Sequence, residues 1–354
     1  MSTRSSMLLV SAGVLWGTGG LAGTLLRDAT GLHPLAVASY RLLLGGLFAT
    51  AVLAATGGLR IVRPPQVDTA RSAPVLTDTA RSTGHRADDP TGALAYGIRS
   101  GRRSAWGVNG AATRRLLASG SLLALFQGCY FASISVSSVS LATMITIGSV
   151  AVFVAVASAV SSRRLPDRAT AAMVGLSVVG LGLLAGGPGP ASGWSAALGV
   201  ATSLLSGAGF AALTMLNRTP VPGLEPAKVT ALGCLAGGVL LLPLAALTGL
   251  GVPTGIDGIA AALYLGAVPT ALAYAAYYRG LRDAQATTAA LVTVLEPLTA
   301  TVLAVLLFGE RLGVAGWVGA ALLAAAVICS QLTGSRVTSH GSASAGAATV
   351  RPGG

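Results

Sequence analysis

Long apolar runs, each close to twenty residues, alternate with short polar breaks along most of the chain. A helix of that length, rising about 1.5 Å per residue, crosses a hydrocarbon core roughly 30 Å thick. We therefore predict an all-α polytopic membrane protein with ten transmembrane helices. The predicted spans are approximately 7–26, 35–56, 116–136, 139–160, 169–187, 194–216, 227–248, 256–278, 286–308 and 314–332.

The apolar pattern occurs twice. Residues 128–165 align with residues 275–312 without a gap, so that Tyr130 falls on Tyr277 and Thr146 on Thr293. Each half contains five spans, and because five is odd, the second half enters the membrane from the opposite side. The sequence thus predicts two inverted five-helix repeats, an arrangement typical of secondary transporters that bind substrate where the repeats meet.

The repeats and the polar segments divide the chain into domains. The first repeat covers 1–187, a linker rich in Gly and Pro covers 188–193, and the second repeat covers 194–332. An insert at about 57–113 is rich in Arg, Gly, Ser, Thr and Pro, and is predicted to be disordered. It is either a tolerated insertion or an arm with a regulatory or lipid-binding role. The tail, 333–354, is also predicted to be unstructured.

Composition and charge agree with a membrane protein. The chain is 53% hydrophobic and 10% charged, against about 25% charged residues in soluble domains. With the N-terminus in the cytoplasm, all of the 23 Lys and Arg residues except Arg27, Arg41 and Arg311 fall on the inside. This positive-inside bias predicts that both termini are cytoplasmic. We attribute the net charge of +12 to this topology and to attraction between basic segments and the lipid bilayer. We therefore predict no nucleic-acid partner.

Two ionisable side chains, Arg41 and Glu296, lie well inside predicted spans. A charge at that depth is costly and usually faces a cavity or a partner. Pro297 follows the carboxylate and cannot donate to the carbonyl of Thr293, so we expect a kink and a freed carbonyl there. Glu296 is a candidate for substrate binding and proton exchange, or a structural residue bonded to a neighbouring helix. Arg41 could hold an anionic substrate group, pair with Glu296 or extend to the outer surface.

Aromatic side chains within spans are further candidates, since they make up only 5% of the chain. Trp16 lies in the middle of the first span and Tyr274 lies in the eighth. Each carries a polar atom that needs a partner, which suits a cavity wall. We therefore predict substrate contacts for both. For Tyr130, Tyr277 and Tyr278, core packing or a place in the interfacial belt is the favoured interpretation.

Motifs for enzymatic or ATP-driven chemistry are missing from the sequence. Lys228 is the one lysine and lies in no phosphate-binding loop. Cys129, Cys234 and Cys329 lack metal-ligand spacing. We therefore predict no catalytic residues, no metal and no cofactor. Two alternatives to a transporter are a membrane-embedded enzyme acting on a lipid intermediate and a non-transporting membrane scaffold.

The second repeat ends with three short motifs, Leu295–Leu298, Leu307–Leu312 and Gly316–Gly319. Together with Trp16 and Arg41, these motifs resemble the pattern of the EamA-type family of the drug/metabolite transporter superfamily. The resemblance covers nearly all of both halves. It implies a plasma-membrane carrier that exports amino acids or other small metabolites without ATP. It also implies a cavity between spans 1–4 and 6–9, with spans 5 and 10 at the periphery or at a homodimer contact.

The first repeat departs from this pattern. Ser149 and Val150 stand where the second copy has Glu296 and Pro297. We therefore expect one carboxylate in the site instead of a symmetric pair. The predicted function is alternating-access export of a small polar metabolite, with Glu296 as the candidate for proton coupling.

Overall fold

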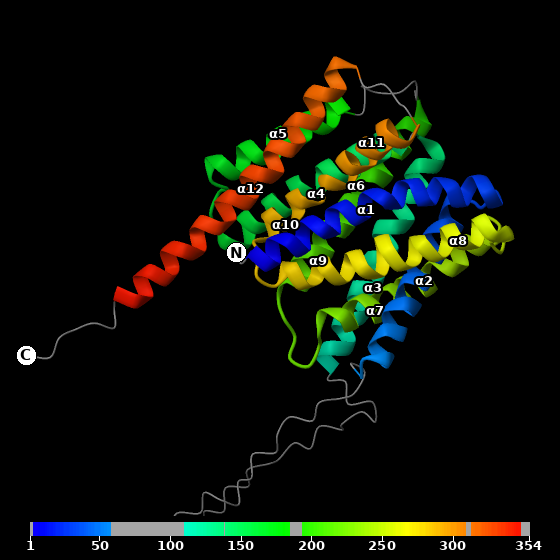
Figure 1. Cartoon of the computed structure of the whole chain (residues 1–354), viewed down its shortest axis with the longest axis horizontal. Coiled ribbons are helices and arrows are strands. Elements are labelled where there is room, and N and C mark those ends of the chain that lie inside the picture. Colours follow the sequence, from blue (N-terminus) through cyan, green and yellow to red (C-terminus); the bar gives the residue numbers. More distant parts are fainter. Residues whose placement is uncertain (1–2, 58–109, 138, 185–192, 309–312, 348–354) are drawn as a thin grey trace, which may run out of the picture.

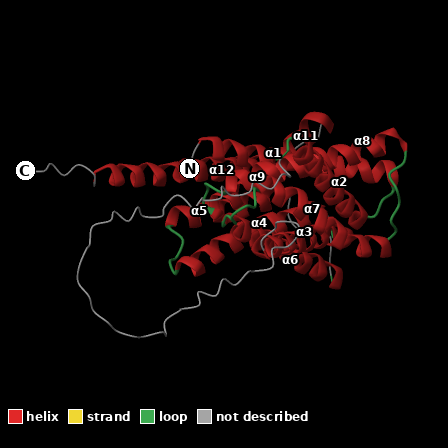
Figure 2. Ribbon diagram, turned by 90° about the horizontal axis from the view of Figure 1, so that it is seen from below, coloured by secondary structure: helices red, strands yellow, loops and turns green. Residues whose placement is uncertain are grey.

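The computed structural model is a bundle of long helices (Figures 1 and 2). It describes residues 3–57, 110–137, 139–184, 193–308 and 313–347. These residues form helices, turns and one isolated bridge between Val221 and Leu224. The helices are α1 (Thr3–Thr30), α2 (Pro34–Ala55), α3 (Gly110–Val136), α4 (Val139–Ser162), α5 (Arg168–Leu184), α6 (Trp194–Arg218), α7 (Pro226–Leu247), α8 (Gly255–Gly266), the π-helix η2 (Ala267–Leu272), α9 (Ala273–Leu281), α10 (Ala286–Val292), α11 (Leu295–Phe308) and α12 (Val314–Ala347).

Within the described part of the chain, nine helical segments are long and apolar enough to cross a membrane. Two of them are interrupted: α8, η2 and α9 form one segment, and α10 and α11 form another. The apolar helix α5 is shorter, with 17 residues. The predicted fold class, an all-α polytopic membrane protein, is confirmed. The count of ten spans and the inversion of the repeats stay predictions.

The C-terminal region differs from the prediction. Helix α12 continues to Ala347, although the sequence predicts an unstructured tail from residue 333. No proline precedes Pro352 in this region, so nothing in the backbone forces the helix to end earlier. The prediction of disorder for the insert falls largely on residues 58–109, which lie outside the described residues. Helix α3 already begins at Gly110, within the predicted insert.

The helices of the two halves pack reciprocally. From the first half, α1 packs against α8, α9 and α11 of the second, while α6 packs against α3 and α4 of the first. Helices α2 and α7 pack against each other, and α5 and α12 form a pair along one side of the bundle (Figure 1). Since each half completes the packing of the other, any cavity at the centre is built from both.

Close contact between α2 and α7 depends on glycine. A Cβ atom on Gly46 would lie 2.6 Å from the backbone nitrogen of Leu235, and one on Gly238 would lie 2.9 Å from that of Leu43. Lipid provides no hydrophobic drive between helices, so close backbone packing through small residues is an important source of helix association. These glycines therefore fix the spacing between the halves.

We predict that Gly46→Ala lowers the apparent melting temperature of the purified protein in detergent, measured by thermal unfolding. Overpacking of this kind costs about 1–3 kcal/mol. Gly20→Ala is the matched control, because Gly20 lies in a helix and a Cβ there meets no atom within 4 Å. If both variants melt at the same temperature, the proposed dependence on close α2–α7 packing is wrong.

Candidate substrate-binding cavity

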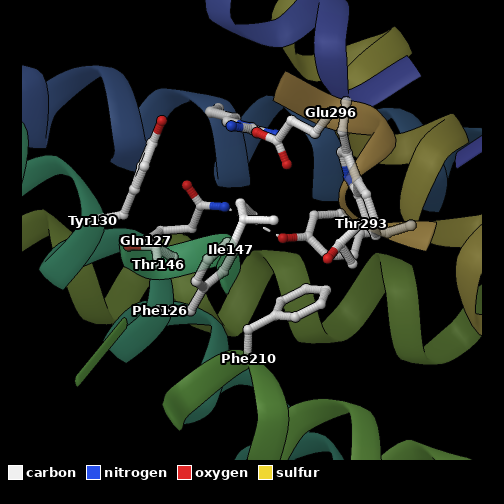
Figure 3. Close-up of a pocket in the computed structure, with 11 residues that line it drawn as sticks. Phe126, Gln127, Tyr130, Thr146, Ile147, Phe210, Thr293 and Glu296 are labelled. Carbon is white, nitrogen blue, oxygen red and sulfur yellow. Dashed lines mark hydrogen bonds between the residues drawn. The ribbon is translucent and has the colours of Figure 1, made fainter. Parts of the chain in front are cut away.

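A central cavity lies where helices of both halves meet (Figure 3). Its free volume is about 10 Å³, which accommodates about one water molecule. Pockets that hold drug-sized ligands have volumes of roughly 300–1,000 Å³. A metabolite therefore fits only if the surrounding helices move apart. The lining residues are Trp16, Arg41, Phe126, Gln127, Tyr130, Thr146, Ile147, Phe210, Tyr274, Thr293 and Glu296.

The buried guanidinium of Arg41 is held by the π-helix η2. Pro269 has no N–H to donate to the carbonyl of Leu265, and the hydroxyl of Thr270 donates to that carbonyl instead, at 2.8 Å. Arg41 Nε donates to Thr270 Oγ1 at 3.1 Å, and Nη2 donates to the Pro269 carbonyl at 3.4 Å. Arg41 is 6% exposed, so it does not extend to the surface. The irregular turn thus provides the oxygen atoms that a buried cation requires.

The second interruption places Glu296 at the start of α11. Thr293 and Val294 form a turn between α10 and α11, so the helix is broken near Pro297, where the sequence predicts a kink. The prediction of a freed Thr293 carbonyl is wrong. That carbonyl accepts a hydrogen bond from the Glu296 N–H at 3.0 Å. The Thr293 hydroxyl donates to the carbonyl of Ala290 at 2.7 Å. The tighter turn compensates for the N–H that proline lacks.

The carboxylate of Glu296 points into the cavity (Figure 3). Among the described residues it has no hydrogen-bond partner and forms no ion pair with Arg41, although both line the same space. A structural role through a bond to a neighbouring helix therefore has no support in the described contacts. The cavity presents one anchored guanidinium and one carboxyl group that is open to a ligand.

An aromatic cluster forms one wall of the cavity. The Trp16 ring lies 5.3 Å from Tyr274, 5.0 Å from Tyr277 and 5.7 Å from Phe210, between ring centroids. Gln127 Nε2 donates to the Tyr274 hydroxyl at 3.3 Å. Trp16 Nε1 and Gln127 Oε1 are buried without a hydrogen-bond partner. Buried polar atoms are rarely left unpaired, so this wall offers one donor and one acceptor to a bound molecule.

The structure brings together the four residues predicted to bind substrate: Glu296, Arg41, Trp16 and Tyr274. Substrate binding by these four residues remains a prediction. The sequence does not single out Gln127 or Phe210 as substrate contacts. For Tyr130 it favours core packing, and Tyr130 does pack against the core. Tyr130 also lines the cavity and bonds Thr143 through its hydroxyl at 2.7 Å. A polar glutamine within an apolar span was the available signal for Gln127. For Phe210, no signal separates a cavity residue from a core residue.

Residues that align in the predicted duplication lie together in the cavity, and the two copies differ there. Thr146 and Thr293, which align in the two copies, both line the cavity. Ser149 occupies the position that aligns with Glu296, and its hydroxyl donates to the Thr146 carbonyl at 2.9 Å. Among the described lining residues, Glu296 is thus the sole carboxylate. The matching motif residues Gly309–Leu312 lie outside the described part of the chain.

Comparisons with known proteins agree with this architecture. Residues 197–331 match the model of the EamA-like transporter family. The chain is 26% identical over 201 residues to the uncharacterised transporter YwfM of Bacillus subtilis (strain 168). This alignment covers 57% of this chain and 67% of YwfM. A solved crystal structure superposes with a TM-score of 0.69 at 16% identity, over 95% of this chain and 99% of the other, and so shares the fold. The resemblance to EamA-type transporters is therefore confirmed, and the family match itself covers residues 197–331, the second half of the chain.

We predict that Thr270→Val destabilises the protein by about 1–3 kcal/mol, because it removes the partner of the buried Arg41 Nε and the hydroxyl that donates to the buried Leu265 carbonyl. The measurement is thermal unfolding in detergent. Thr24→Val is the control, since its hydroxyl also bonds a carbonyl of the preceding turn but is exposed. Equal melting temperatures for the two variants would show that Thr270 does not hold Arg41 in place.

Proposed function

We propose that this multi-pass membrane protein, whose second half matches the EamA-like transporter family, is a secondary transporter that exports small polar metabolites such as amino acids. One observation carries the proposal. A cavity between the two halves is lined by Arg41, by Glu296 and by two residues that each carry an unpaired polar atom, Trp16 and Gln127. A zwitterionic or polar molecule would satisfy these groups, whereas a purely apolar molecule would leave them unpaired.

The size of the cavity supports alternating access as the mechanism. Its free volume of about 10 Å³ is too small for a metabolite. Substrate must therefore enter a conformation in which the helices are further apart. In transporters built from two repeats, such opening commonly occurs by movement of one group of helices against the other around a fixed central site. The reciprocal packing of the two halves suits that movement.

We assign the protein to the plasma membrane with both termini in the cytoplasm. The distribution of Lys and Arg supports this orientation through the positive-inside rule. The start of α1 and the C-terminal part of α12 lie toward the same end of the bundle (Figure 1), as an even number of spans requires. Export then moves substrate from the end that carries Arg115, Arg279 and Arg282 toward the opposite end.

Proton coupling through Glu296 is tested in liposomes that contain purified protein, with a panel of amino acids and an imposed pH gradient. We expect Glu296→Gln to retain some substrate exchange but to lose acceleration by the gradient, because the amide cannot take up a proton. Glu225→Gln, at an exposed helix start, is the control and should behave as wild type. A wild-type response of Glu296→Gln to the gradient would contradict the coupling role.

A second test addresses substrate contact. Gln127→Leu removes the unpaired Oε1 acceptor from the cavity. One lost hydrogen bond of about 1 kcal/mol should raise the KM for transport roughly fivefold. Gln285→Leu, at an exposed position, is the control. An unchanged KM for Gln127→Leu would place the substrate elsewhere.

A further inference from the structure

A second cavity lies at one end of the bundle, where α3 and α7 begin and α6 and α9 end. Its free volume is about 20 Å³, little more than one water molecule needs, so a larger group enters only if lining side chains such as the exposed Arg282 move outward. Two arginines line it, and its lining contains no carboxylate. The lining residues are Arg115, Asn217, Thr219, Pro220, Val221, Leu224, Pro226, Val229, Tyr278 and Arg282.

Arg115 is fixed against the end of α6. Its Nη1 donates to the carbonyl of Leu216 and, at 3.1 Å, to the carbonyl of Thr219. The last carbonyls of a helix lack partners within the helix and carry partial negative charge. A cation at this position is therefore stabilised by the backbone. The guanidinium has five N–H donors, so further donors remain for a ligand.

Arg282 reaches the same cavity from the end of α9. Its Nη2 donates to the Leu224 carbonyl at 3.1 Å. The neighbouring acidic residues do not neutralise the cavity: Glu225 and Asp283 are exposed and do not line it, and Asp283 accepts a hydrogen bond from Ser5 at 2.9 Å. The cavity therefore holds two positive charges whose described partners are neutral carbonyl groups.

Tyr278 supplies an independent observation. Its side chain is 2% exposed, and its hydroxyl is buried without a hydrogen-bond partner. The ring lies 5.9 Å from that of Tyr274, between centroids, and Tyr274 lines the central cavity. This pair of rings thus lies between the two cavities. Tyr278 lines the same cavity as Arg115 and Arg282, and its unpaired hydroxyl is a neutral donor for a ligand there.

We propose that this second cavity binds a phosphate group through Arg115, Arg282 and Tyr278. Guanidinium groups bind phosphate oxygens in a fixed, often bidentate geometry, and a phenol can donate to a remaining oxygen. The phosphate belongs either to the headgroup of an anionic lipid or to a free phosphate ion. Basic cavities between transmembrane helices near the cytoplasmic surface are suited to anionic headgroups. The proposal does not depend on the transported substrate or on the direction of transport.

The test is native mass spectrometry of the full-length protein titrated with phosphatidylglycerol against a phosphatidylcholine background. We expect Arg115→Gln and Arg282→Gln to weaken phosphatidylglycerol binding at least tenfold. Arg279→Gln removes the same charge from an exposed position on α9 that does not line the cavity, and should bind nearly as wild type. Tyr278→Phe preserves the ring and should weaken phosphatidylglycerol binding severalfold. This variant tests the site independently if an arginine variant does not fold.

A competition arm distinguishes the two sources of phosphate. If millimolar inorganic phosphate displaces phosphatidylglycerol from wild type, and stabilises wild type but not Arg115→Gln, the occupant is the free ion. If inorganic phosphate has no effect while the arginine variants lose lipid, the occupant is the headgroup.

Equal losses of phosphatidylglycerol binding in all three arginine variants would show general attraction to anionic lipid and overturn the proposed site. Unchanged phosphatidylglycerol binding in both Arg115→Gln and Arg282→Gln would also overturn the proposed site. Because binding is measured without transport, failure here leaves the proposed function untouched.

Discussion

The hydrocarbon core of a membrane contains no water to bond a backbone group that a helix leaves free. That constraint governs both interrupted helices of this protein. Pro269 and Pro297 each remove a backbone donor. The first loss is repaired by the Thr270 hydroxyl, and the second by a tighter turn that ends at the N–H of Glu296. Both of these replacement hydrogen bonds lie beside the central cavity. The need to satisfy the backbone therefore also helps to determine where Arg41 and Glu296 are placed.

The two charged residues use these interruptions differently. Arg41 is bonded to the irregular turn and is thus anchored to a neighbouring helix. The carboxylate of Glu296 has no partner among the described residues and faces the cavity. With Trp16 Nε1 and Gln127 Oε1 also unpaired, the site combines a rigid cation with groups that await a ligand. The small volume of the cavity implies that binding is linked to movement of helices, since no metabolite fits the present packing.

The sequence predicts the general architecture well, because apolar runs and their polar breaks depend on the thickness of the bilayer. It also identifies Arg41 and Glu296, since charges within spans are rare. It does not predict which side of each helix faces the cavity, because spans that are apolar all round carry no directional pattern. Phe210 lines the site only because α6 packs against α3 and α4. The π-helix was also missed, since Pro269 alone does not specify how the carbonyl of Leu265 is satisfied.

The most direct measurement is an electron cryo-microscopy structure of the protein with a transported substrate bound. The account predicts substrate density between Arg41 and Glu296, in contact with Trp16 Nε1 and Gln127 Oε1, in a cavity wider than the present one. Density between other helices, such as α5 and α12, with the central cavity still closed, would contradict it.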